Sequence, residues 1–118
     1  RLGAELGRAA SRVTAALAAL PPAAQEELLR TQIALIRQLQ AAGAIPLQRM
    51  CVSCRHFRPH AHPRAARPHH CAFVDAAIGG RDLRLDCSEH EAADPAVQAA
   101  AWTTFAAGSA PVQAPPPT

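Results

Sequence analysis

Four cysteines limit what this chain can fold into more than any other feature of its sequence. They are Cys51, Cys54, Cys71 and Cys87, in the pattern C-x2-C-x16-C-x15-C, and all lie within residues 47–91. That segment has few apolar residues, so it cannot build a substantial hydrophobic core by itself. A metal ion would supply the missing folding free energy, because its ligands come together only in the folded state. The pattern therefore predicts a metal site formed by the four cysteines.

A glycine turn lies midway between the last two cysteines. Residues 79–82 have the sequence Gly-Gly-Arg-Asp, and glycine suits the turn of a hairpin. Leu83 and Leu85 then alternate with polar residues, as in a half-buried strand. We therefore expect a β-hairpin that places Cys71 beside Cys87, so that the C-x2-C knuckle can close a tetrahedral site.

Zinc is the first candidate for this site, because closed structural sites hold it with four thiolates. An iron–sulfur cluster is the second, because it also takes four cysteines. Redox-active thiols or disulfides, and inert cysteines, stay open as alternatives, although nothing here suggests the secretion that favours disulfides. Four thiolates need nearby positive charge, and Arg49, Arg55 and Arg58 are expected to provide it and to favour the thiolate form.

Histidines crowd the same segment and widen the list of possible ligands. His70 adjoins the third cysteine, and His90 follows the fourth at the spacing C-x2-H. Either could replace a cysteine or support one from outside, since imidazole is a good zinc ligand. We expect His56, His60 and His62 to lie in a solvated, proline-rich loop.

Two helices are expected before the cysteines. Apolar residues at spacings of three and four form one stripe over residues 1–20. Pro21-Pro22 ends this helix, because proline lacks an amide hydrogen and restricts the residue before it. A second helix should follow over residues 22–42 and end at Gly43. Its apolar residues cover more than one side of the helix, so the first helix can bury only some of them. The others must pack against the cysteine segment or against another copy of the chain.

The C-terminal part is simpler. Asp94-Pro95 can start a short helix, whose Trp102 and Phe105 are expected to fold back onto the body of the protein. The fold class predicted is mainly α: an antiparallel helix pair, a small four-cysteine metal-knuckle and β-hairpin module, and a short C-terminal helix. The expected units are a dimerisation-type helical hairpin (1–46), a cysteine-rich metal-binding module (47–92), a short helix (93–108) and a disordered tail (109–118).

Charge is arranged in two adjacent blocks. Residues 28–74 hold seven arginines and no acid, whereas residues 75–94 hold six acids and two arginines. We expect these blocks to meet in the folded chain. Nucleic-acid binding by the basic block is a weaker interpretation, because only Phe57 lies nearby to stack on a base.

Several classes of function lack their characteristic motifs. The sequence has no G-x-S-x-G, no H-E-x-x-H and no glycine loop that cradles phosphate, and four thiolates would leave zinc without an open position. No apolar run reaches the roughly 18 residues that a membrane span needs, and no secretory signal is visible. We therefore expect a cytoplasmic protein that is not an enzyme.

The run MCVSCRHFRPHAHPRAARPHHCAFVDAAIGGRDLRLDCSEHE, residues 50–91, resembles a cysteine-rich C-terminal extension of some bacterial MarR-family transcription regulators. Upstream, LGRAASRVTAALAALPPAAQEELLRTQIALIRQLQ resembles the last two helices of MarR proteins, and the whole resemblance covers about residues 2–106. It implies a homodimer paired through these helices. It also implies that the winged helix that reads DNA would precede Arg1, outside this sequence. Two alternatives stay open: a thiol- or metal-responsive redox switch, and a free-standing zinc-binding interaction module.

Overall fold

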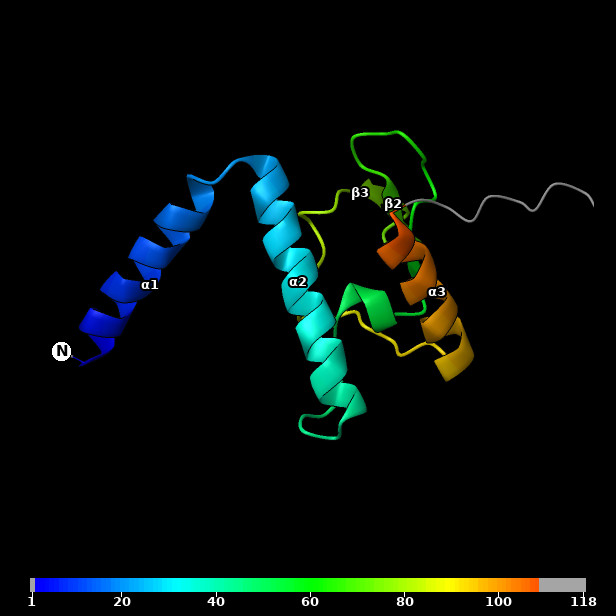
Figure 1. Cartoon of the computed structure of the whole chain (residues 1–118), viewed down its shortest axis with the longest axis horizontal. Coiled ribbons are helices and arrows are strands. Elements are labelled where there is room, and N and C mark those ends of the chain that lie inside the picture. The colour runs from blue at the N-terminus through cyan, green and yellow to red at the C-terminus, as the bar shows by residue number, and fades with distance from the viewer. Residues whose placement is uncertain (1, 109–118) are drawn as a thin grey trace, which may run out of the picture.

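The computed structural model describes the backbone of residues 2–108 and the side chains of residues 6–108 (Figure 1). Its three helices are α1 (Leu2–Ala18), α2 (Pro22–Ala41) and α3 (Pro95–Ala107). Between α2 and α3 lie a short 3-10 helix, η1 (Cys51–Ser53), and the strands β1 (Phe57–Arg58), β2 (His69–Cys71) and β3 (Ala76–Ile78). The predicted disordered tail, residues 109–118, falls outside the described residues.

The ends of the helices follow local sequence features. Pro22 and Pro95 occupy first-turn positions of α2 and α3, where the missing amide hydrogen costs nothing. Gly43 (φ 72°) and Gly108 (φ 76°) follow the last turns of the same helices in the left-handed conformation that glycine adopts without strain. The bounds of α2 are therefore close to those expected from Pro21-Pro22 and Gly43.

The predicted fold class, mainly α with an antiparallel helix pair, is wrong. The chain combines three helices with a three-stranded antiparallel sheet, and α1 diverges from α2 beyond their connection (Figure 1). On α1, Leu6 is 62% exposed and Val13 is 59% exposed. Helix α2 finds its large apolar partners, such as Phe57 and Phe105, in the segments that follow it. Ile33 of α2 packs into a core shared with the cysteine segment and α3.

The sheet has the order β1-β2-β3, and its register pairs Phe57 with Cys71 and Cys71 with Ala76. The hairpin turn therefore lies at residues 72–75, where Asp75 has a φ of 52°. Aspartate tolerates this left-handed conformation better than most residues, which allows the early turn.

The expected hairpin around residues 79–82 is consequently wrong in position. These residues do turn, since Asp82 donates its N–H to the Gly79 carbonyl at 3.0 Å, but the turn joins no pair of strands. The chain after it runs against the segment before η1. There the Cys51 N–H donates to the Arg84 carbonyl at 3.1 Å, and the Cys87 N–H donates to the Arg49 carbonyl at 2.9 Å.

One small apolar core joins α2, the cysteine segment and α3. Its buried members are Ile33, Met50, Val52, Phe57, Leu83 and Phe105. As the sequence predicts, Trp102 and Phe105 pack back onto the body. The Arg37 guanidinium lies 4.2 Å from the centroid of the Trp102 ring, a cation–π contact between α2 and α3. The core is thus shared among three segments.

The expected meeting of the charge blocks is confirmed. Arg49 lies 2.6 Å from Asp86 and Arg55 lies 3.6 Å from Glu91, each pair joining the basic block to the acidic one. All four side chains are largely exposed, so these pairs add little to the free energy of unfolding.

Candidate metal centre

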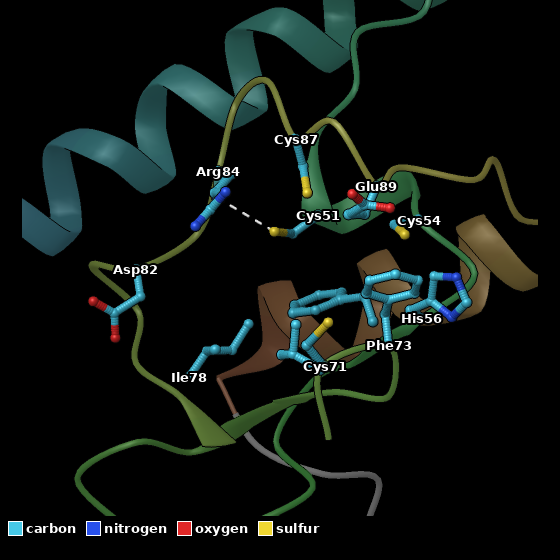
Figure 2. A pocket seen from close by; sticks show the side chains of 12 residues that line it. Cys51, Cys54, His56, Cys71, Phe73, Ile78, Asp82, Arg84, Cys87 and Glu89 are labelled. Carbon is cyan, nitrogen blue, oxygen red and sulfur yellow. Dashed lines mark hydrogen bonds between the residues drawn. The ribbon is translucent and has the colours of Figure 1, made fainter. Parts of the chain in front are cut away.

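All four cysteines line one cavity of about 230 Å³ (Figure 2). We call it the cysteine cavity. In Figure 2, Cys51, Cys54 and Cys87 lie together on one side of it, and Cys71 lies on the opposite side, on β2. The remaining lining residues are His56, Phe57, Phe73, Val74, Ile78, Asp82, Arg84 and Glu89. The cavity therefore offers four sulfur atoms within mostly apolar walls.

Backbone hydrogen bonds place three of the four thiols. Cys51 and Cys54 flank a single 3-10 turn, closed by the Cys54 N–H donating to the Cys51 carbonyl at 2.9 Å. This brings the two ends of the C-x2-C knuckle to one side of the cavity. Cys87 reaches the same side because its N–H bonds to the Arg49 carbonyl, two residues before the knuckle.

The electrostatics at Cys51 differ from the expected positive field. Burial raises the pKa of the Cys51 thiol, and charge on Cys87, Cys54 or Cys71 raises it further, because thiolates repel each other. The Arg84 N–H, which donates to Cys51 Sγ at 3.3 Å, acts in the opposite direction. A thiol in this position stays protonated more readily than a free cysteine, unless a cation offsets the repulsion.

The arginines expected to favour the thiolates are occupied elsewhere. Arg49 pairs with Asp86, and Arg55 with Glu91. The Arg58 guanidinium donates to the carbonyls of its own loop, including that of Arg55 at 2.6 Å. Acidic neighbours and backbone carbonyls therefore hold these guanidinium groups, although, after the hydrogen bond to Asp86, the charge of Cys87 still helps to raise the pKa of Arg49.

The two histidines considered as substitute ligands do not line the cysteine cavity. His90 Nε2 lies 2.9 Å from Ser53 Oγ, and burial, followed by the positive charge of Arg49, lowers the pKa of its ring. His70 hydrogen-bonds to His62 and Asp75 instead. Either histidine would have to give up these partners to reach a metal among the cysteines.

Sequence reasoning missed the polar residues of the cavity wall, which are His56, Asp82, Arg84 and Glu89. Two of them, His56 and Glu89, lie two residues after a cysteine, and in each case a turn at residues 55–56 or 88–89 brings the side chain back to the cavity. His56 was expected to be solvated, yet its Nε2 lies 2.8 Å from Glu91 Oε2. His60 was expected to be solvated too, but it is half-buried, with its ring 4.5 Å from that of His69.

The donor set fits a metal ion by its chemistry, since thiolates are preferred ligands of zinc and of iron–sulfur clusters. Among residues 6–108, no three or more histidine, cysteine or acidic side chains already stand in a metal-binding arrangement. The four cysteines thus share a cavity, and coordination would draw their sulfur atoms closer together, to about 2.3 Å from a zinc ion.

Within the part of the chain that the structure describes, no helix has the length and apolar character needed to cross a membrane. Comparison of the chain with models of protein families, with curated proteins and with solved structures gives no match.

Proposed function

We propose that this chain is the metal-binding and dimerisation part of a MarR-like bacterial transcription regulator, acting in the cytoplasm. The observation that carries the proposal is that four cysteine side chains, from the knuckle at residues 51–54, from β2 and from residue 87, line one cavity. Few uses other than metal binding require four thiols at one place in so small a protein.

The resident metal proposed is zinc, held by Cys51, Cys54, Cys71 and Cys87. Its role is structural, because it ties β2 and residue 87 to the knuckle, where the protein core itself is small. The repulsion among the thiolates at Cys51 supports a cation at this place. An iron–sulfur cluster on the same four ligands is the alternative, and its colour would distinguish it.

Elemental analysis and an absorption spectrum of the freshly purified protein test the metal site. We expect about one zinc per chain and no colour. Each single Cys→Ser variant at the four positions should lose most of the metal, and residues 47–92 should become sensitive to protease while the helices persist. His90→Ala is the matched control: it removes a nearby side chain that does not line the cysteine cavity, so metal content should stay unchanged.

Two outcomes would change this assignment. A brown protein that contains iron and sulfide would favour the cluster over zinc. A metal-free protein whose residues 47–92 resist protease would contradict both metals, and would favour disulfides between the cysteines.

The dimerisation part of the proposal rests on α1. Its apolar side chains face solvent: Leu6, Val13 and Leu17 are 62%, 59% and 40% exposed. A helix of 17 residues is marginally stable in water without tertiary contacts. A second copy of the chain, contributing the same stripe, would cover these side chains around a two-fold axis.

Replacing Val13 tests that interface. The variant Val13→Glu should shift the molecular mass measured by light scattering from dimer towards monomer, because a buried carboxylate is costly. Ser11→Glu adds the same charge to the opposite side of α1 and should leave the mass unchanged. A wild-type protein that is monomeric at micromolar concentrations would contradict dimerisation and leave the metal proposal intact.

A further inference from the structure

Three polar side chains form a chain of contacts that is separate from the cysteine cavity. His62 Nε2 lies 3.0 Å from His70 Nδ1, and His70 Nε2 lies 3.0 Å from Asp75 Oδ1. The two imidazole rings are 5.1 Å apart between centroids and meet edge to face. None of the three residues lines the cysteine cavity. We propose that His62 and His70 bind a second, exchangeable divalent transition-metal ion, with Asp75 orienting His70.

The carboxylate determines which nitrogen of His70 is free. An ionised aspartate only accepts hydrogen bonds, so the His70 nitrogen beside Asp75, Nε2, carries the hydrogen. A neutral His70 then presents the lone pair of Nδ1 towards His62. A carboxylate that fixes the tautomer of a histidine in this way is the usual support of a metal-binding imidazole.

The backbone holds the three residues in place independently of one another. The His62 N–H donates to the Pro68 carbonyl at 2.8 Å, which ties the histidine-rich loop to the start of β2. His70 is paired with Ala77 in the antiparallel sheet. Asp75 lies in the β2–β3 turn with its left-handed φ of 52°. The facing nitrogens therefore come from a loop and a strand whose positions are already set.

The space between the two ring nitrogens now holds a hydrogen bond, in which His62 Nε2–H donates to His70 Nδ1. A divalent cation replaces that hydrogen: His62 shifts its proton from Nε2 to Nδ1 through solvent, and both imidazoles bind as neutral ligands. No net proton is released. His62 is exposed, so water molecules can complete the coordination sphere.

The chemistry of the ligands indicates which ions would bind. Imidazole nitrogen suits Cu²⁺, Ni²⁺ and Zn²⁺, and the general order of affinity places Cu²⁺ first. Two protein ligands hold an ion more weakly than four, so the ion should exchange with the medium. His70 and Cys71 are adjacent on β2, where successive side chains point to opposite faces. An ion at the histidine pair would thus bind on the other face of the strand that carries a cysteine of the cavity.

Titration of the full chain with Ni²⁺ tests the site, after the zinc content of the protein has been measured. Calorimetry should detect one weak site, and the paramagnetic ion should broaden the ring-proton resonances of His62 and His70. His62→Ala should abolish this binding, and its exposure makes the fold insensitive to the change. Asp75→Asn should weaken it about 10-fold, at the lower end of effects seen for carboxylates that support a metal ligand. His90→Ala is the control and should bind Ni²⁺ as the wild type does, because its ring contacts Ser53 instead.

Equal Ni²⁺ binding by wild type and His62→Ala would overturn the inference, as would no binding by the wild type. Nickel bound to the cysteine thiolates would give an intense charge-transfer absorption band, and nickel bound to the two histidines would not. The inference stands apart from the proposed function. Metal retained at the cysteines without a response of His62 to Ni²⁺ contradicts the histidine site alone, whereas Ni²⁺ at His62 in a protein that contains neither zinc nor iron contradicts the cysteine site alone.

Discussion

Replacing Phe105 by alanine should cost more stability than any change on the exposed surface of the protein. Phe105 is 4% exposed, and its ring centroid lies 6.1 Å from Phe57, 5.4 Å from His69 and 5.6 Å from Trp102. Truncating a buried phenylalanine costs about 3–5 kcal/mol of unfolding free energy, from lost apolar burial and the cavity left behind. We expect about 4 kcal/mol here. A core this small contributes a similar free energy of unfolding, about 3–5 kcal/mol. The metal-free variant should therefore be largely unfolded in the segment that connects α2 to α3.

Urea unfolding of Phe105→Ala and of the wild type, both as purified with the proposed metal bound, measures this cost. Trp102 is the only tryptophan and lies on α3, so its fluorescence reports the docking of that helix, with circular dichroism as a second probe. Phe73→Ala is the matched control: the same chemical change at a side chain that is 52% exposed should cost less than about 1 kcal/mol. Equal costs at the two positions, or a cost below about 1 kcal/mol at Phe105, would refute the reasoning. Added zinc should restore part of the lost stability by binding the folded state.

Two further predictions concern the same core. Burial, with help from the charges of His60 and Arg30, lowers the pKa of His69 from 6.5 to about 4. The contribution of neutral His69 to the free energy of unfolding is complete above pH 6.5 and falls by up to about 3 kcal/mol as the pH approaches 4. It falls because His69 of the unfolded chain takes up a proton at a higher pH than His69 of the folded chain. Urea midpoints between pH 7 and pH 4 should therefore fall less steeply in His69→Gln than in wild type, and parallel slopes would contradict this. Arg37→Gln should lower the free energy of unfolding by about 0.5–1 kcal/mol, because the cation–π contact is lost. It should also change the Trp102 fluorescence of the folded state. Unchanged emission would show that the contact is absent in solution.

Local sequence features determined the ends of the helices and brought together two of the four cysteines proposed as metal ligands. Proline and glycine act on their own backbone and on immediate neighbours, so Pro21-Pro22, Gly43 and Pro95 set helix bounds without help from the rest of the chain. The C-x2-C spacing needs only one turn to aim two thiols the same way. The four cysteines do line one cavity, as the spacing predicted, although the expected hairpin that was to place Cys71 beside Cys87 forms elsewhere.

Tertiary structure decided which segments meet. The glycines at residues 79 and 80 and the alternation of Leu83 and Leu85 favoured the later of two turns after Cys71. The turn at residues 72–75 forms the sheet, and the later one at residues 79–82 directs the chain to the knuckle. Likewise, the apolar face of α2 packs on α3 and the cysteine segment rather than on α1, and the loop that holds His62 meets β2. These outcomes depend on which distant segments compete successfully for the limited apolar area and for backbone hydrogen-bond partners. Local sequence patterns, which reflect only neighbouring residues, cannot predict the result of that competition.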